Sequence, residues 1–249
     1  MTTPSGRVFA IGDIHGCAGE LETLLTGLAL TAGDTLIFVG DYIDRGPDSR
    51  AVVDLMLDVQ RRTELTSVFL KGNHEDMYLA YLGRPGHWGE VWLSNGGRHA
   101  LVSYGLHPDA SPVEVLDALP ERHLRFFEEL ATFHITGSHL VVHAGVRPDR
   151  RWTEQDEEDL LWIREDFISR PHALPQTVVF GHTPQRTVLV DLPYKVGIDT
   201  GCVYGGMLTA LELGSQELVQ VRRGERRVRR SALQGMRATL GGLFSGRRA

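Results

Sequence analysis

The sequence has few cysteines and no long apolar run. Cys17 and Cys202 are the only cysteines in 249 residues, too few for a disulfide framework, and neither belongs to a CxxC zinc pattern. We expect reduced, buried thiols in preference to redox control or an additional metal ligand. No apolar stretch approaches the ~18 residues of a membrane span, and the first residues show no signal-peptide pattern. A cytoplasmic protein is expected.

The charge is distributed unevenly along the chain. The formal net charge is −6, but residues 222–249 hold nine Arg against one Glu, a net of +8, which leaves −14 for residues 1–221. The composition, 42% hydrophobic and 23% charged, suits one large folded domain. We expect that domain at 1–221, followed by a basic tail at 222–249. A flexible, solvated tail is favoured over contact with nucleic acid or an anionic membrane.

Short β-rich runs alternate with helical patterns in the first seventy residues. RVFAI (7–11), TLIFVG (35–40) and TSVFLKG (66–72) are typical of strands buried on both faces. Apolar residues at helical spacing lie between them, which indicates βαβαβ with parallel strands. Residues 77–130 are mainly helical in pattern. Later strands are expected at 139–145, 177–183, 186–191, 194–201 and 207–213. The pattern indicates an α/β protein, either a three-layer α/β/α arrangement or a two-sheet sandwich.

Polar side chains collect where these strands end. The first strand ends in GDIHG, the second in GDYIDRG and the third in GNHE, while later strands end in VHAG and FGHTP. Because ligand crevices lie outside the carboxyl ends of parallel strands, these loops should converge. The expected cluster of oxygen and nitrogen donors is Asp13, His15, Asp41, Asn73, His143 and His182. Taken alone, GDIHG is equally a helix-capping turn; the joint arrival of six donors favours a metal site.

The types of donor indicate which ions they would bind. Carboxylate, imidazole and amide ligands without thiolate suit Mn, Fe or Zn better than Ca or a soft metal. Asp41 could bridge two cations, and two metals ~3.5–4 Å apart would clamp the attacking and leaving oxygens of a phosphoryl displacement. A hydroxide between the metals would supply the nucleophile.

The three motifs together resemble a known signature. GDIHG, GDYIDRG and GNHE, with leading glycines 28 and 32 residues apart, resemble the phosphoprotein phosphatase (PPP) family within the calcineurin-like metallophosphoesterases. HAG and GH follow in order, and DTGCVYGG near Asp199 is similar to the closing segment of bacterial members. The resemblance implies a β-sandwich flanked by helices (α/β/β/α), with the helical insertion around Trp88 and Trp92 over the active-site cleft. Residues 1–221 would be the catalytic domain.

The resemblance also implies a role for each site residue. It makes Asp13, His15 and His182 ligands of one divalent ion, Asn73 and His143 ligands of the other, and Asp41 the bridge. The ions would be Mn, with Fe or Zn as alternatives.

The same resemblance makes His74 the general acid, supported by Asp44, and makes Arg45 and Arg164 the phosphate-binding residues. For Arg164, the segment TEQDEEDLLWIRED equally indicates a surface salt bridge on an amphipathic helix. Glu75 is interpreted as negative charge in the first turn of a helix.

The expected function is metal-dependent hydrolysis of phosphomonoesters on proteins. Phosphoserine and phosphothreonine would be the main substrates, with phosphotyrosine and small aryl phosphates as further ones. The alternative is hydrolysis of dinucleoside tetraphosphates or RNA caps, because HAGVRP and IDTGCVYGG also resemble diadenosine tetraphosphatases. Those enzymes more often have GNHD and GHW where this chain has Glu75 and Thr183. A non-catalytic phosphate- or RNA-binding module is disfavoured, because a binder needs no proton donor such as His74.

Overall fold

The computed structural model describes residues 6–233 and contains two mixed sheets. The strands of the first sheet are β1 (Val8–Ile11), β2 (Thr35–Phe38), β3 (Thr66–Phe69), β9 (Met207–Glu212), β10 (Glu217–Arg222) and β11 (Val228–Ala232), in the order β11-β10-β9-β1-β2-β3. Helices α1 (Ala18–Gly27) and α2 (Ser49–Gln60) connect β1, β2 and β3, which are parallel. The predicted βαβαβ unit is therefore confirmed.

The second sheet follows the helical insertion in sequence. Its strands are β4 (Phe133–Thr136), β5 (His139–Val142), β6 (Thr177–Phe180), β7 (Leu189–Asp191) and β8 (Lys195–Gly197), in the order β4-β5-β6-β8-β7. The three central strands β5, β6 and β8 are parallel, whereas β4 and β7 are antiparallel to their neighbours. Both sheets thus contain three parallel strands, and the loops after β1, β2, β3, β5 and β6 carry the predicted donors.

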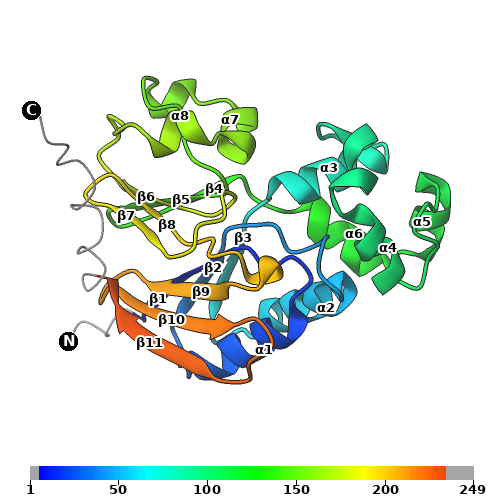
Figure 1. The fold of residues 1–249 in the computed structure, drawn as a ribbon, viewed down its shortest axis with the longest axis horizontal. Helices are drawn as coiled ribbons and strands as arrows, with labels where there is room; N and C mark the ends of the chain where they lie inside the picture. The colour runs from blue at the N-terminus through cyan, green and yellow to red at the C-terminus, as the bar shows by residue number, and fades with distance from the viewer. Residues whose placement is uncertain (1–5, 234–249) are drawn as a thin grey trace, which may run out of the picture.

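The sheets pack face to face, and helices cover both outer faces (Figure 1). Ala10 and Ile37 of the first sheet share a buried apolar cluster with Val141 and Val179 of the second. The outer face of the second sheet is covered by α7 (Glu157–Trp162) and α8 (Glu165–Ile168), and that of the first by α1 and α2. Of the two expected architectures, the sandwich in α/β/β/α layers is confirmed.

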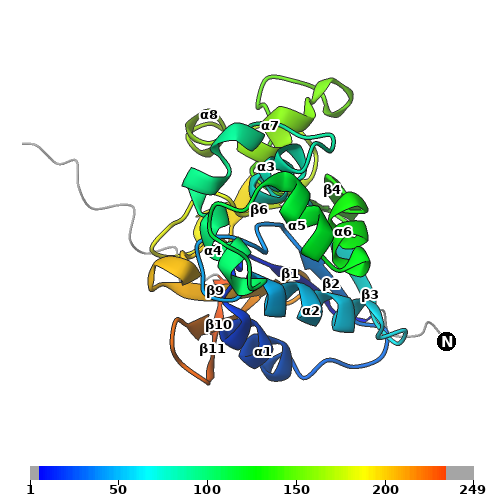
Figure 2. The same cartoon turned by 90° about the vertical axis from the view of Figure 1, so that its right-hand side faces the viewer.

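The helical region between β3 and β4 in the sequence forms the insertion. It contains α3 (Asn73–Tyr81), α4 (Gly97–Ser103), α5 (Pro112–Ala118) and α6 (Glu121–Glu128), with short 3-10 turns η1 (Gly89–Val91) and η2 (Leu93–Asn95). Figure 2 shows this region facing the viewer, with α7 and α8 above it and α1 below. The remaining 3-10 turns are η3 (Trp152–Glu154) and η4 (Cys202–Tyr204). No helix within residues 6–233 is long and apolar enough to cross a membrane.

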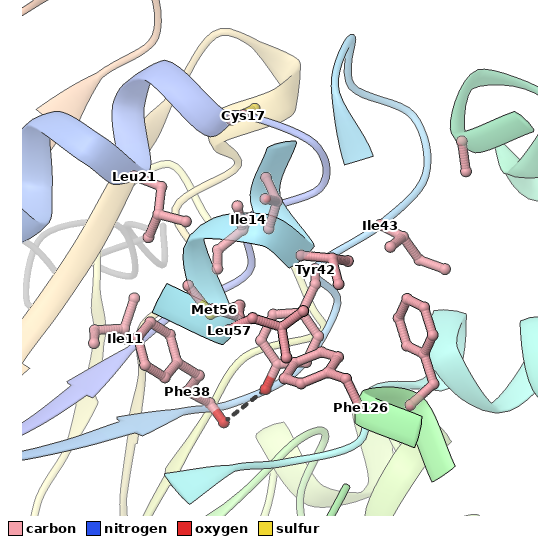
Figure 3. Packing of buried hydrophobic residues seen from close by; sticks show 14 of the residues in the cluster. Ile11, Ile14, Cys17, Leu21, Phe38, Tyr42, Ile43, Met56, Leu57 and Phe126 are labelled. Atoms are coloured by element: carbon pink, nitrogen blue, oxygen red, sulfur yellow. Dashed lines mark hydrogen bonds between the residues drawn. The ribbon is translucent and has the colours of Figure 1, made fainter. Parts of the chain in front are cut away.

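Tyr42 anchors the loop after β2 in the core. Its ring packs against Phe126 of α6 at 5.5 Å between centroids and lies 6.5 Å from Phe38 (Figure 3). The phenol O–H donates to the carbonyl of Leu70 at 2.8 Å, which ties this loop to the end of β3. The residue directly after Asp41 is therefore fixed by both packing and hydrogen bonding.

The C-terminal boundary differs from the sequence-based expectation. A tail beginning at residue 222 would cut β10 at its last residue, and the chain continues as β11, which pairs antiparallel with β10. Leu233 is buried, and Arg223 donates to Glu20 of α1 at 2.7 Å. The folded body therefore extends to at least Leu233, because arginines are tolerated on an exposed edge strand. Residues 234–249 of the expected tail lie outside the described residues.

Candidate active site

The six predicted donors meet at the carboxyl ends of strands from both sheets. Asp13 and His15 follow β1, Asp41 follows β2, and Asn73 begins α3 just after β3. His143 and His182 follow β5 and β6 of the second sheet. All six side chains are buried: Asp13, His15, Asp41, Asn73, His143 and His182. Six polar side chains buried together need hydrogen-bond or metal partners, because burying a polar group without one costs free energy.

One set of donors surrounds the amide oxygen of Asn73. The Nε2 atom of His143 lies 3.0 Å from Asn73 Oδ1, and the Nδ1 atom of His182 lies 2.9 Å from it. Ligand atoms of Asp41, His143 and His182 all lie within 4.8 Å of one another. This arrangement differs from the expectation that His182 binds the same ion as Asp13 and His15. Only its backbone N–H reaches Asp13, at 2.9 Å from Oδ2.

A second set lies on the other side of Asp41. Ligand atoms of His15, Asp41 and His74 lie within 4.8 Å of one another, and His15 Nε2 is 3.3 Å from Asp41 Oδ2. Asp41 has its other oxygen 3.4 Å from His143 Nε2. This carboxylate thus lies between the two sets, as a bridging ligand must.

Backbone carbonyls orient two of the imidazoles for ligation. His15 Nδ1 is 2.8 Å from the carbonyl of Ile43, and His143 Nδ1 is 2.9 Å from that of Val39. A carbonyl only accepts, so the Nδ1 atoms carry the protons and the Nε2 lone pairs face Asp41. Metal-binding histidines are commonly held by this kind of second hydrogen bond.

The local charges also fit divalent cations. Burial, followed by the charges of Asp199 and Asp41, raises the pKa of Asp13 well above its usual range. Burial would raise the pKa of Asp41 too, but the imidazoles of His143, His74 and His15 hold it well below its usual range. Asp199, which was not predicted as a site residue, has its pKa raised by burial to about 6. Bound cations would relieve this repulsion among carboxylates, and His182 Nε2 has no other partner within residues 6–233.

The loops that carry the donors have unusual backbone conformations. His15, Asp41, Asp44, Arg45 and His182 all have φ between +45° and +74°. This left-handed region costs a non-glycine residue roughly 1–2 kcal/mol, and such strain concentrates at functional sites. These backbone conformations direct the five side chains toward the same small volume, which explains why the strain is retained.

His74 pairs with Asp44 beside the donor cluster. Its Nδ1 atom is 2.6 Å from Asp44 Oδ2, while Nε2 is buried without a partner in the described part of the chain. Burial lowers the pKa of His74 well below its usual range, and the negative charge of Asp41 opposes this effect. The Asp44 backbone N–H donates to Ser49 Oγ at 3.0 Å, which fixes the position of the carboxylate.

Trp92 is a site residue that sequence reasoning missed. Its indole Nε1–H donates to the same Asp44 oxygen that faces His74, at 2.8 Å, and the side chain is fully buried. The resemblance placed this tryptophan in the insertion over the cleft but did not give its bond to Asp44. Its separation of 48 residues from Asp44 gives no local signal.

Glu75 does more than contribute charge to the first turn of α3. Its carboxylate accepts the backbone N–H groups of Asp41 and Tyr42 at 2.8 Å, Ile43 at 3.3 Å and Gly72 at 3.0 Å. The side chain is fully buried, and burial raises its pKa to about 8. Glu75 therefore ties the loop after β2 to the start of α3. It holds Asp41 and Asn73 in register.

Two arginines lie at the edge of the cluster. Arg45 has Nη1 2.6 Å from His15 Nε2, and its guanidinium lies over the ring of Tyr204, 5.7 Å from the centroid. Arg164 is exposed, forms no side-chain hydrogen bond or ion pair within residues 6–233, and lines an open pocket of about 560 Å³ with Trp162. The pKa of His182 is lowered mainly by burial and then by the charges of His143 and Arg164. The charge of Arg164 thus reaches the donor cluster. The surface salt bridge considered for Arg164 is not formed with any residue from 6 to 233.

A buried cluster of hard and borderline donors between two packed sheets, with arginines at its edge, is typical of hydrolases that cleave phosphoric esters with divalent metal ions. Comparison with known proteins agrees: the chain belongs to the calcineurin-like phosphoesterase family, whose model matches residues 6–206. The resemblance drawn from the motifs is confirmed, and the protein is a hydrolase acting on phosphoric esters. Enzymes of this fold use a pair of divalent ions.

Similar proteins of known name include two different activities. Serine/threonine-protein phosphatase 1 of Salmonella typhimurium is 35% identical over 208 residues, covering 82% of this chain and 90% of that protein. The asymmetrical bis(5'-nucleosyl)-tetraphosphatase PrpE of Bacillus anthracis is 28% identical over 237 residues, covering 85% and 92%. The crystal structure of a putative diadenosine tetraphosphatase matches with a TM-score of 0.65 and 27% identity over 89% of this chain and 96% of that one.

Proposed function

We propose that this protein is a protein phosphatase that hydrolyses phosphoserine and phosphothreonine, with phosphotyrosine as a further substrate. The observation that carries the proposal is the buried His74–Asp44 pair, whose free Nε2 faces away from Asp44 beside the donor cluster. Serine and threonine leave as strongly basic alkoxides, so their release gains most from a positioned proton donor. The 35% identical protein phosphatase supports the same substrate class.

Each residue has a defined task in this proposal. Asp13, His15 and Asp41 would hold one ion, preferably Mn²⁺, and Asp41, Asn73, His143 and His182 the other. Such ions, when bound, supply Lewis acidity toward phosphoryl oxygens. Arg45 and Arg164 bind the phosphate oxygens through their guanidinium groups, whose fork geometry matches phosphate.

His74 transfers the proton in this mechanism. The protonated imidazole donates through Nδ1 to Asp44, which keeps the ring oriented, and gives its Nε2 proton to the departing oxygen. Asp44 stabilises the charged imidazole, and Trp92 holds Asp44. The proton therefore arrives from a ring that is fixed before the substrate binds.

The acid role predicts a dependence on the leaving group. His74→Asn should lower kcat by the ~10²–10⁴ typical of lost acid-base catalysis on a phosphoserine peptide. The loss on p-nitrophenyl phosphate should be smaller, because p-nitrophenolate leaves without a proton. Metal content measured alongside should stay near that of the wild type. Equal losses on both substrates, or loss of metal from the variant, would contradict the acid assignment.

Hydrolysis of dinucleoside tetraphosphates is the second candidate. It is supported by the PrpE relatives and by the matching structure of a putative diadenosine tetraphosphatase. The deciding measurement is kcat/KM with Mn²⁺ on a phosphopeptide panel beside diadenosine tetraphosphate. Faster hydrolysis of the dinucleotide would transfer the assignment to this candidate. If none of these substrates is hydrolysed in a metal-dependent way, a non-catalytic binding module is favoured instead.

A further inference from the structure

The two cysteines of the chain meet beside the active site. Cys17 lies at the start of α1, two residues after His15, and Cys202 begins η4, three residues after Asp199. Both are free and buried, and their Sγ atoms lie within 4.8 Å of one another. The expected buried thiols are thus confirmed, but their meeting from opposite ends of the chain was not predicted.

A metal ion is not the best partner for this pair. Glu20 has an oxygen within the same 4.8 Å, which would give a three-ligand set. Its carboxylate is already engaged, however, since Oε2 accepts from Arg223 Nη1 at 2.7 Å and Oε1 from the Gly224 N–H at 2.8 Å. Two sulfur ligands remain, fewer than the four of a structural zinc site. A pair of thiols without a third free ligand is suited to forming a disulfide.

We propose that Cys17 and Cys202 form a covalent modification site, at which a hydroperoxide converts the two thiols into an intramolecular disulfide. One sulfur attacks the peroxide, breaking the O–O bond to give a sulfenic acid and water. The second sulfur displaces the sulfenic oxygen as another water. Overall, two thiols lose two protons and two electrons while one H₂O₂ becomes two H₂O.

A surface pocket lies next to the residues that flank Cys17. The pocket has a volume of about 280 Å³ and lies against the chain on both sides of Cys17, with Gly16, Ala18 and Glu20 in its lining. Arg223 and Gly224 of the β10–β11 turn form the opposite wall. Cys17 itself is buried and does not line the pocket, so the oxidant has to be uncharged and close to water in size, as hydrogen peroxide is.

Disulfide formation would act on the catalytic loops. The two sulfurs have to approach to ~2.05 Å, which draws the turn at Cys17 toward η4. Gly16 cannot move independently, because a Cβ on it would lie 3.0 Å from the backbone carbon of Gly46. Displacement of Cys17 is therefore passed to His15 and to Arg45, which precedes Gly46. A shift of about 1 Å at a catalytic group can cost on the order of a hundredfold in rate.

Chemical readouts test the modification independently of activity. The reduced full-length protein is treated with hydrogen peroxide, denatured in an alkylating reagent and examined by intact mass and peptide mapping. We expect a monomer lighter by two hydrogen atoms, no alkylatable thiol, and one peptide pair joining Cys17 to Cys202. Dithiothreitol should restore both thiols. Cys202→Ala and Cys17→Ala are the matched controls, since one thiol cannot form this bond, and their thermal midpoints verify folding.

The activity readout rests on the proposed function. Oxidised wild type should lose on the order of tenfold to a hundredfold in kcat/KM on p-nitrophenyl phosphate, reversibly. Cys202→Ala under the same peroxide should keep its activity, which separates the disulfide from oxidation of a bound metal. If reduced wild type shows no metal-dependent turnover, the proposed function fails, while mass and thiol count still decide the disulfide.

Four results would overturn the modification site. The thiols could stay alkylatable after peroxide, they could gain oxygen as sulfinic acids, or the disulfide could form only between chains. A stoichiometric zinc ion that protects both thiols in the purified full chain would also overturn it, because the pair would then be a metal site.

Discussion

Trp92 illustrates how a single buried residue tunes the proposed acid. Asp44 Oδ2 accepts both the indole N–H of Trp92 and Nδ1 of His74. Trp92→Phe keeps an aromatic ring at the site but removes one of these donors. Asp44 would then hold the imidazole less firmly, and a lost buried hydrogen bond costs about 1 kcal/mol of stability or more.

For Trp92→Phe we expect kcat on a phosphoserine peptide to fall about tenfold, with little change in KM or metal content. Steady-state kinetics and metal analysis measure this. Trp88→Phe is the matched control, since Trp88 belongs to the same insertion but is half exposed, and the indole that donates to Asp44 is that of Trp92. An equal effect from both variants would indicate general loosening of the insertion.

The lowered pKa of Asp34 predicts that the stability of the protein depends on pH. It is buried, and burial alone would raise its pKa, but hydrogen bonds from Arg7 and from the Thr31 N–H hold the pKa below its usual range. A carboxyl whose pKa is lower in the folded state stabilises the protein above its unfolded pKa of about 3.9. This contribution disappears as the pH falls through the folded value.

Asp34→Asn should therefore be less stable than the wild type at pH 7. The difference between their urea midpoints should shrink as the pH falls below about 4. Urea unfolding of both proteins from pH 7 to pH 3 provides the measurement. A difference that stays constant with pH would show that Asp34 acts through packing and not through its charge.

Among the elements, β11 turns an arginine-rich segment into part of the domain. It pairs with β10 along Val228–Ala232, and Val228 packs so closely on α1 that a Cβ at Gly27 would lie 2.1 Å from its Cγ1 atom. Arg230 donates to the Gly27 carbonyl at 2.7 Å. These contacts hold α1 against the β11 edge of the first sheet.

A chain ending at Arg222 should be less stable than one ending at Leu233, by about 2 kcal/mol or more, because a strand and two apolar side chains are lost. Thermal and urea unfolding of the two truncated chains measure the difference. Metal content should be equal in both, since β9 and β10 separate β11 from the strand that carries Asp13 and His15. Equal stability would assign residues 223–233 to the expected tail.

Some elements could be predicted from sequence and others could not. The loops after β1, β2 and β3 were predictable because each carries its donors within a few residues of a strand end. β11 was not, because five arginines from 222 to 229 and a glycine indicate a solvated tail, while the strand depends on pairing with β10. The grouping of His182 was missed because sequence order does not show on which side of Asp41 a ring from the second sheet will lie.

For the whole molecule, the donor cluster is a link between two sheets. Asp41 and Asn73 belong to loops of the first sheet, and His143 and His182 to loops of the second. Ions bound by both groups stabilise the folded state over the unfolded one, by about 2.7 kcal/mol when free ion is a hundredfold above its Kd.

Chelation should therefore lower the thermal midpoint of the wild type, and Mn²⁺ should restore it. Asn73→Ala should show a smaller difference between the two conditions, because Asn73 contacts both histidines of the second sheet. Calorimetry with chelator or with Mn²⁺ gives the four midpoints. Identical midpoints for the wild type in both conditions would contradict metal binding at this cluster.

The origin of the donors in two sheets also sets when the enzyme becomes active during its synthesis. Asp13, His15, Asp41 and Asn73 are made early, but the second sheet supplies His143 and His182 much later in the chain. At ribosomal speeds the interval between residues 73 and 182 lasts roughly 5–20 s. During that time the nascent chain lacks both second-sheet histidines. A growing chain therefore cannot assemble the complete donor cluster before most of it has been translated.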